Sequence, residues 1–169
     1  MIVLETERLS LSLQTEADAA FVLELMNTES WLKFIGDRGI KTIDDARTYI
    51  VNGAIKSYAQ NGFGFYLVRL KENGVCIGIC GLVKRTALMH VDIGFAFMPQ
   101  YEGRGYGLES SSVILEYAKN ILKLECICAI TIKDNQSSIS LLTKLGMVFN
   151  KTINMTGDSE ELMLFEKNL

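Results

Sequence analysis

A glycine-rich turn between a β-prone run and a helical run constrains the fold of this chain more than any other feature. The run Val91 to Met98 ends at Pro99, the only proline. The turn Glu102 to Gly107 contains three glycines and leads into a helical pattern over residues 108–122. Closely spaced glycines let the backbone approach a ligand, and a helix start presents free N–H groups. This order predicts an α/β fold with a phosphate or pyrophosphate site, and a turn without any ligand is the alternative.

Two common phosphate-binding motifs are excluded by their spacing. The P-loop requires Gly-Lys-Ser/Thr, and the sequence contains no Gly-Lys pair. The dinucleotide fingerprint G-x-G-x-x-G, begun at Gly103, needs a glycine where Leu108 stands. Begun at Gly105, it needs a glycine at Ser110. A phosphate site at this turn must therefore belong to another class.

The composition is that of one globular domain. Of the 169 residues, 49% are hydrophobic and 22% charged, so we expect one domain, residues 1–169. The net charge of −3 argues against a general binder of nucleic acid or of anionic membranes. The apolar stretch Val75 to Val83 is shorter than the ~20 residues of a membrane span, and Met1 to Leu4 is too short for a signal peptide. We therefore expect a cytoplasmic protein with no membrane partner.

The four cysteines do not follow a metal-binding pattern. Cys76 and Cys80 lie in one apolar, β-prone run, and Cys126 and Cys128 lie in another. The only histidine is His90. A structural zinc site takes four Cys or His ligands, usually from loops. We therefore expect reduced thiols in buried strands and no bound metal.

The periodicity of apolar residues indicates a mixed α/β sheet. Alternating leucines predict a first strand, and Asn73-Gly74 predicts a hairpin between two later strands. Thr42 and Asp45 form a weak capping box that opens a helix, and Asn61-Gly62 ends it. Residues 31–41 are expected to form a loop. The expected strands are residues 9–13, 63–70, 75–84, 91–98, 126–132, 147–155 and 160–167, with the last two joined around Thr156-Gly157-Asp158, and the expected helices are residues 15–27, 42–60, 108–122 and 134–145.

Four short motifs occur in a consistent order along the chain. They are Thr6-Glu7-Arg8-Leu9, the glycine-rich turn with its flanks from Asp92 to Glu109, Asn135-x-x-Ser138, and Lys144-Leu145-Gly146-Met147. Together they resemble the GNAT superfamily of acyl-CoA-dependent N-acetyltransferases, most closely its bacterial RimJ/RimL-like members. The family pattern Gln/Arg-x-x-Gly-x-Gly/Ala fits from Gln100 or from Glu102, and the second fit departs from the family at its first residue.

The resemblance implies a single GNAT domain that uses acetyl-CoA as cosubstrate. Its fold would be a central, mostly antiparallel mixed sheet of about seven strands, splayed between the fourth and fifth and flanked by about four helices. Backbone groups of Phe97 and Met98 would bind pantetheine. The turn would bind the pyrophosphate through the N–H groups of Gly103, Arg104, Gly105, Tyr106, Gly107 and Leu108. The Arg104 side chain is either a phosphate contact or a solvated loop cation, and the Tyr106 ring is expected to pack the helix onto the sheet.

The motif Asn135-x-x-Ser138 follows a predicted buried strand. The resemblance implies that Asn135 contacts the pantetheine or acetyl end of the cofactor, and an Asx turn or helix cap is the local alternative. Ser138 would lie near the sulfur. Much of the family uses a tyrosine of this helix to protonate the departing thiolate, and residues 140–143 here contain none. The proton donor is therefore Ser138 or water, or the thiolate leaves unprotonated.

Three side chains are candidates for the general base that takes a proton from the attacking amine. Asp92 occupies the strand position where relatives often carry an acid, and we place it first. His90 lies two residues earlier and is expected on the same strand face. Glu109 matches an acidic residue of the family's helix, or simply favours the helix dipole.

The expected function is transfer of acetyl from acetyl-CoA to a primary amine by direct attack. The acceptor would be a small-molecule amine or a protein N-terminus, and the acidic net charge mildly favours a cationic one. Aromatic and charged residues of the segment from Trp31 to Gly39, with Tyr49, would border the acceptor. The alternative is a non-catalytic, regulatory acyl-CoA-binding module on the same scaffold, which the missing tyrosine and Glu102 favour. Either would be a monomer or a homodimer.

Overall fold

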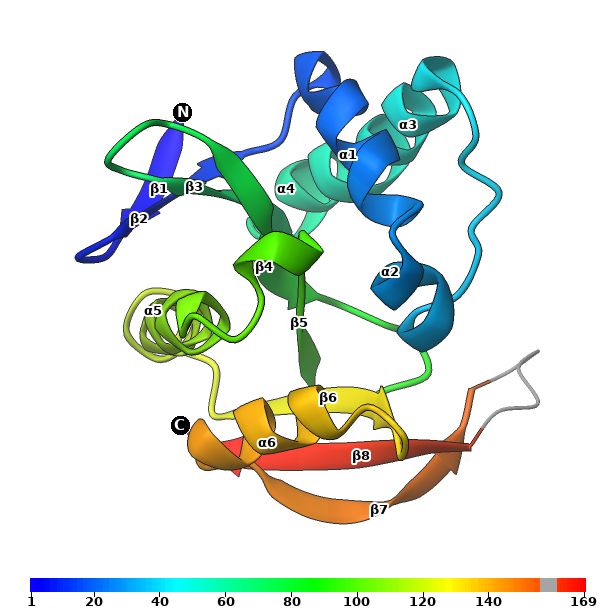
Figure 1. Ribbon diagram of the computed structural model, residues 1–169. Helices are drawn as coiled ribbons and strands as arrows, with labels where there is room; N and C mark the ends of the chain where they lie inside the picture. The colour runs from blue at the N-terminus through cyan, green and yellow to red at the C-terminus, as the bar shows by residue number, and fades with distance from the viewer. Residues whose placement is uncertain (156–160) are drawn as a thin grey trace.

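Eight strands form one open sheet in the part of the chain that the computed structural model describes, residues 1–155 and 161–169 (Figure 1). Neighbouring strands follow the order β1-β2-β3-β4-β5-β6-β8-β7. All neighbours are antiparallel except β5 and β6, which run parallel. The mixed α/β class is confirmed, with one more strand than expected. The strands are β1 (Ile2–Glu5), β2 (Leu9–Leu13), β3 (Phe65–Leu70), β4 (Cys76–Val83), β5 (Val91–Phe97), β6 (Cys126–Ile132), β7 (Val148–Asn154) and β8 (Glu161–Asn168).

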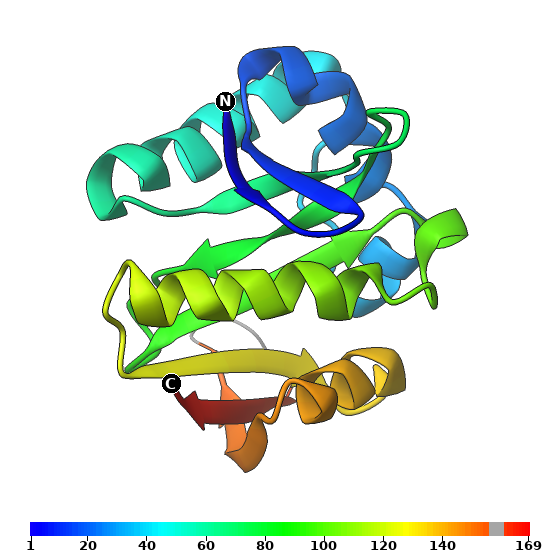
Figure 2. The same ribbon diagram turned by 90° about the vertical axis from the view of Figure 1, so that its left-hand side faces the viewer.

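Helices cover both faces of this sheet. One face carries the four helices that precede β3, and the other carries the two that follow β5 (Figure 1). In Figure 2 the longest helix, α5, runs across the central strands, with α6 beside it. In the described residues the helices are α1 (Ala19–Met26), α2 (Glu29–Phe34), α3 (Ile43–Ile50), α4 (Lys56–Asn61), α5 (Tyr106–Asn120) and α6 (Gln136–Lys144).

Each face of the sheet has its own hydrophobic core because successive strand residues point to opposite sides. Leu67 packs in the core under α1 and α3, with Val22 and Ile50. Its neighbour Val68 packs in the core under α5, with Ile114. All five side chains are at most 3% exposed. The central strands are therefore buried on both faces and form a rigid frame for the residues at their ends.

The sheet splays where β5 meets β6. The two strands pair only at Val91 with Ile127 and at Asp92 with Cys128. Beyond Asp92, β5 continues to Phe97 along β4 and has no partner on its other edge among the described residues. The expected divergence of two central strands is confirmed, and Asp92 lies at its apex.

Several local predictions are confirmed in detail. Thr42 Oγ1 accepts the N–H of Asp45 at 3.1 Å, and Asp45 Oδ2 accepts the N–H of Thr42 at 2.8 Å, which completes the capping box. Gly62 ends α4 with φ +77°, and Gly74 closes the β3–β4 hairpin with φ +73°. Strand β6 has the predicted bounds.

Two elements differ from the expectation. The predicted loop at residues 31–41 begins inside helix α2, because Thr28 caps that helix by accepting the N–H of Trp31. Strand β1 was not expected, and it forms by pairing with β2.

The helix predicted over residues 42–60 is continuous, with a π-helical turn at Val51–Ile55 between α3 and α4.

The last predicted turn, Thr156-Gly157-Asp158, and the predicted strand start at Glu160 lie outside the described residues. The strands on either side, β7 and β8, pair as predicted. Across the ranges 1–155 and 161–169, every helix is too short or too polar to span a bilayer.

Candidate functional site

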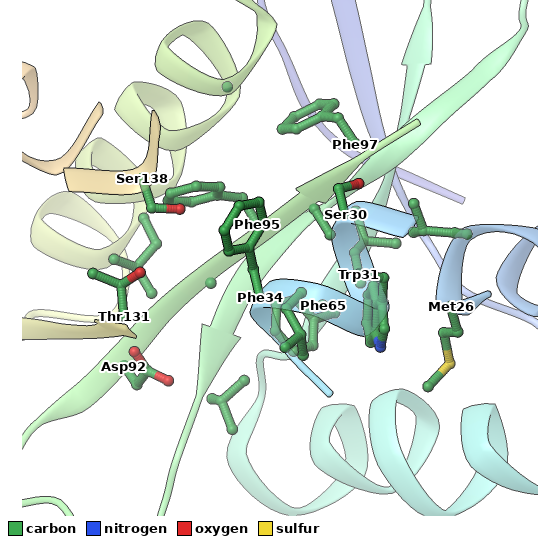
Figure 3. A pocket seen from close by; sticks show the side chains of 18 of the residues that line it. Met26, Ser30, Trp31, Phe34, Phe65, Asp92, Phe95, Phe97, Thr131 and Ser138 are labelled. Carbon is green, nitrogen blue, oxygen red and sulfur yellow. The ribbon is translucent and has the colours of Figure 1, made fainter. Parts of the chain in front are cut away.

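A cavity of about 1310 Å³ opens where β5 and β6 diverge. One end is lined by the glycine-rich turn, α6 and the end of β6, and we call it the cofactor half. The other end is lined by α1–α4, the loop after α2, and the strands β3–β5, and we call it the acceptor half. In Figure 3 Asp92, Thr131 and Ser138 lie on one side of the cavity, facing Trp31, Phe34 and Phe65 on the other.

The glycine-rich turn provides the N–H groups that the sequence predicted for it. Gly103 and Gly105 have φ +72° and +83°, a left-handed conformation that favours glycine. Gly105 is the N-cap of α5, so the N–H groups of the first helical residues have no partner within the helix. Of the predicted turn residues, the ones that line the cavity are Gly103, Gly105, Tyr106, Gly107 and Leu108.

Arg104 is the one predicted turn residue that does not line the cavity. Its guanidinium carbon lies 5.8 Å from the ring centroid of Tyr101, a cation–π contact at the outside of the turn. Its carbonyl oxygen accepts a hydrogen bond from Arg8 Nη1 at 3.2 Å. This placement favours the local alternative, a surface cation, over a phosphate contact by the side chain.

Arg8 supports the turn from the start of β2, and sequence reasoning gave it no role. Its Nε lies 2.6 Å from Glu109 Oε2, and its guanidinium carbon lies 4.5 Å from the ring centroid of Tyr106. A Cβ built on Gly105 would lie 3.3 Å from Arg8 Nη2. The motif Thr6-Glu7-Arg8-Leu9 marked this arginine, but no local pattern shows that it reaches the turn.

The Glu109 carboxylate is fully engaged in this support. Oε1 accepts hydrogen bonds from Thr6 Oγ1 at 2.6 Å and from the Arg8 N–H at 2.9 Å. Burial raises the pKa of Glu109, but these hydrogen bonds and the charge of Arg8 outweigh it, and the net pKa lies below the ordinary value. Glu109 does not line the cavity. Its position and its hydrogen bonds favour a structural role over that of a base.

The free backbone groups of β5 belong to Phe95 and Phe97. The N–H of Met98 donates to the Ile77 carbonyl at 2.9 Å, and the Met98 carbonyl accepts from Tyr101. Because hydrogen bonding alternates along an antiparallel pair, Phe95 and Phe97 direct their N–H and C=O groups to the open edge. Met98 is also 6% exposed and absent from the cavity lining. The backbone groups of Phe97 are therefore open to a ligand, as are those of Phe95, which was not singled out, while those of Met98 are already hydrogen-bonded.

Asn135 and Ser138 meet at the start of α6. Asn135 Oδ1 accepts the N–H of Ser138 at 3.1 Å, so the helix-cap alternative is realised. This leaves the Asn135 amide nitrogen available as a donor, and both residues line the cavity. Sequence reasoning missed Thr131, a 9% exposed residue of β6 whose side chain lies between Asp92 and Ser138 in Figure 3.

Asp92 is buried at the apex of the splay and paired with an arginine that sequence reasoning did not single out. Arg85 Nε donates to Asp92 Oδ2 at 2.7 Å, while Asp92 Oδ1 has no hydrogen-bond partner among the described residues. The Asp92 side chain is 2% exposed. Burial raises the pKa of Asp92 to about 6, although the charge and hydrogen bond of Arg85 oppose the shift. Such a carboxyl changes its protonation state near neutral pH.

His90 does not reach the cavity lining. It lies just before β5, and its carbonyl oxygen accepts a hydrogen bond from Cys128 Sγ at 3.3 Å.

The four cysteine thiols are also absent from the cavity lining. Burial raises the pKa of Cys80 to about 11 and that of Cys128 to about 12. Within the described ranges, no three His, Cys, Asp or Glu side chains are grouped closely enough to hold a metal ion.

Several aromatic side chains line the acceptor half. Trp31 and Phe34 come from α2, Tyr49 from α3, Phe65 from β3 and Phe95 from β5. Trp31 is 5% exposed and packs in the core under α1 and α3, while its indole N–H has no partner among the described residues. This half has room for a largely apolar body beside the polar groups at Asp92.

Comparison with known proteins gives the same fold and names the family. The sequence model of the acetyltransferase (GNAT) domain matches residues 8–148. The uncharacterized N-acetyltransferase YoaA of Bacillus subtilis is 27% identical over 146 residues, which cover 85% of this chain and 81% of YoaA. An acetyltransferase from Agrobacterium tumefaciens superposes with a TM-score of 0.84 at 21% identity, over 100% of this chain and 95% of that one. RimL, a ribosomal L7/L12 alpha-N-protein acetyltransferase solved with coenzyme A, also gives 0.84, at 14% identity over 100% and 98%. This chain belongs to the GNAT acetyltransferase family.

Proposed function

We propose that the protein transfers the acetyl group of acetyl-CoA to a primary amine. The observation that carries this proposal is the continuity of one cavity from the N–H groups of the glycine-rich turn, past Asp92, to the aromatic acceptor half. A donor bound along β5 and an acceptor bound from the other side would meet at the splay. Holding two reactants in contact in this way is a major source of rate enhancement.

The cofactor half offers suitable groups to the successive parts of coenzyme A, from its pyrophosphate to its thioester. The N–H groups at the start of α5 would bind an anion, and the charge of the nearby Glu109 is balanced by its ion pair with Arg8. The free backbone edge at Phe95 and Phe97 would pair with the amides of pantetheine as an added strand would. The Asn135 side-chain amide would donate to a carbonyl near the thioester.

The reaction we propose is direct aminolysis. The amine nitrogen forms a bond to the thioester carbonyl carbon, the carbon–sulfur bond breaks, and the products are an N-acetyl amine and the thiol of coenzyme A. Asp92, in its ionised form, would accept the proton that the amine loses, directly or through water. An acetyl-cysteine route is disfavoured because no cysteine lines the cavity and the buried thiols resist ionisation.

The departing thiolate would take its proton from a hydroxyl or from water. Ser138 and Thr131 both line the cavity beside Asp92 (Figure 3). The tyrosine that much of the family uses on this helix is replaced here by residues without an acidic hydroxyl. Because a thiol is far more acidic than an alcohol or an amine, a thiolate can also leave without a strong acid. We therefore assign Ser138 a hydrogen-bonding role at the sulfur.

The alternative function is a regulatory module that binds acyl-CoA without turnover, favoured by the missing tyrosine and by Glu102. Two measurements separate it from the proposal. Thermal shift is measured with acetyl-CoA, and release of free thiol is then followed over a panel of amines and peptides. A higher Tm with turnover supports the proposal, and a higher Tm without turnover of any acceptor supports the module. No change in Tm with either CoA or acetyl-CoA contradicts both.

A further inference from the structure

Four charged side chains line the acceptor half: Arg38, Asp45, Arg85 and Asp92. The two acids are already engaged. Asp45 Oδ2 accepts the backbone N–H groups of Lys41 and Thr42, at 3.0 Å and 2.8 Å. Asp92 Oδ2 accepts from Arg85 Nε. One oxygen of each acid is thereby occupied, Asp92 Oδ1 stays open, and the unpaired donors of this half belong to the two arginines.

Arg38 is an exposed residue that lines the cavity from the loop after α2. Gly36 and Gly39, with φ +103° and +70°, flank the pair Asp37-Arg38. Asp37 does not neutralise its neighbour, because Oδ1 accepts the Gly39 N–H at 2.8 Å and Oδ2 pairs with Lys41 Nζ at 3.0 Å. Within the described residues, Arg38 forms no ion pair.

Arg85 approaches the same region from the segment between β4 and β5. Its Nε is bound to Asp92, and its two terminal nitrogens have no protein acceptor in the described ranges. The hydrogen bond to buried Asp92 fixes the plane of the guanidinium group. A guanidinium with a fixed plane and free terminal nitrogens is suited to a planar anion such as a carboxylate.

Tyr49 of α3 lines the same half of the cavity as the two arginines. The positive charges of Arg38 and Arg85 both act on its hydroxyl and lower its pKa, but burial has the larger effect and raises it. The hydroxyl therefore stays protonated and can donate a hydrogen bond. Tyr49, Arg38 and Arg85 line the acceptor half as three donors from three different segments.

We infer that Arg38, Arg85 and Tyr49 bind a carboxylate of the acceptor, so that the acceptor is an amine that also carries a carboxylate. This inference rests on the proposed function for the role of the amine. With the carboxylate on Arg85, the amine of an amino acid lies beside the open oxygen of Asp92, and its side chain extends along the aromatic residues Trp31 and Phe34. The net charge of the whole chain suggested a cationic acceptor, whereas the unpaired donors of Arg38 and Arg85 in this half favour an anionic group on the acceptor.

The test compares acceptors that differ only in the carboxylate. The probes are L-phenylalanine and L-phenylalaninamide, and the amidated tripeptides Glu-Ala-Ala and Gln-Ala-Ala, which place the carboxylate on a side chain. For each pair, the ratio of kcat/KM is measured from thiol release. The variants are Arg38→Gln, Arg85→Gln and the charge-conserving Arg38→Lys. Arg47→Gln is the matched control, because Arg47 lies on α3 two residues from Tyr49, pairs with exposed Asp44, and does not line the cavity.

We expect the wild-type protein to prefer the acceptor with the carboxylate in at least one of the two pairs. Arg38→Gln and Arg85→Gln should lower that preference about tenfold or more, because each removes a charged donor, while Arg38→Lys keeps most of it. Arg47→Gln should not change it. A preference within the first pair identifies a free amino acid, and one within the second identifies an acidic N-terminus. Equal use of both members, or an unchanged ratio in Arg38→Gln and Arg85→Gln, overturns the inference.

A binding measurement separates this inference from the proposed function. N-acetyl-L-phenylalanine and its amide are titrated into the protein with CoA present, and without CoA if CoA does not bind. Tighter binding of the carboxylate, lost in Arg38→Gln, supports the anion site even if no amine is acetylated. Turnover of amines with no preference for a carboxylate leaves the proposed function standing and removes the anion site. Binding of neither compound also contradicts the site.

Discussion

Arg8 Nε and Glu109 Oε2 lie 2.6 Å apart and join residues 101 positions apart in the sequence. This ion pair connects the start of β2 to the first turn of α5, and Arg8 also donates to the carbonyl of Arg104. The glycine-rich turn is therefore fixed from its outer side by Arg8, which lies near the N-terminus just before β2. Its N–H groups are arranged before any ligand binds, which lowers the cost of binding.

Glu109→Gln should weaken acetyl-CoA binding a few-fold and leave the pH dependence of turnover in place. The amide loses the charge that holds Arg8, so the turn becomes less well fixed, but no proton acceptor at the cavity is lost. Binding is measured by calorimetry and turnover by thiol release between pH 5.5 and 9. Glu116→Gln, a control on the same helix, should behave as wild type. A shifted pH profile in Glu109→Gln would show that Glu109 takes part in proton transfer after all.

Gly105→Val should abolish acetyl-CoA binding. Gly105 has φ +83°, which is costly for a β-branched residue, and the new side chain would meet Arg8 Nη2 beside the N–H groups of the turn. Gly62→Val is the matched control, because Gly62 has φ +77° in open space and does not line the cavity. Both variants should lose similar stability, measured as Tm, and only Gly105→Val should lose the stabilisation by acetyl-CoA. Equal binding losses would refute a specific role.

The elements that could be predicted from the sequence are those whose signals are local. Strand β6 is a compact β-branched run, and the α3 capping box needs only residues three apart. Helix α2 was missed because it is short and its signal is a single cap, Thr28. Strand β1 depends on pairing with β2, which no four-residue window contains.

The candidate site could be predicted only in part for the same reason. The turn glycines and Asp92 are visible in the sequence because spacing and resemblance mark them. The phase of hydrogen bonding along β5, which selects Phe95 over Met98, depends on which edge of the strand β4 occupies. Arg85 reaches Asp92 only through the conformation of the segment between β4 and β5. Arg8 reaches Glu109 only because the whole fold brings β2 next to α5.

Asp92→Asn should lower kcat by roughly 10²–10⁴ near neutral pH while acetyl-CoA affinity stays within a few-fold. The amide keeps the shape but cannot take the proton of the amine. Since burial raises the pKa of Asp92 to about 6, wild-type activity should fall as the pH drops below that value. The deficit of the variant should shrink at high pH, where free amine is abundant without a base. Asp44→Asn, an exposed acid paired with Arg47, is the control, and turnover of Asp92→Asn at the wild-type rate at pH 7 would remove Asp92 as the base.

The same carboxyl should make stability depend on pH. The pKa of Asp92 is about 6 in the folded protein against 3.8 as the ordinary value, so between these values the folded state holds more protons than the unfolded state. The free energy of unfolding therefore falls as pH rises through this window, and the penalty is complete above about pH 6. Arg85 stays charged, and Cys128, which also faces Asp92 and has a pKa of about 12, stays neutral, so Asp92 is the group that titrates.

Asp92→Asn removes this penalty, because an amide does not ionise. The difference in Tm between Asp92→Asn and wild type should therefore grow in favour of the variant from pH 4.5 to pH 7.5, by several degrees for a penalty on the order of 2–3 kcal/mol. Scanning calorimetry at four pH values measures it. The difference for Asp44→Asn should stay nearly flat, since that exposed carboxyl is not buried by folding. A difference for Asp92→Asn that is constant or shrinks with rising pH would mean that Arg85 stabilises the carboxylate more than burial destabilises it.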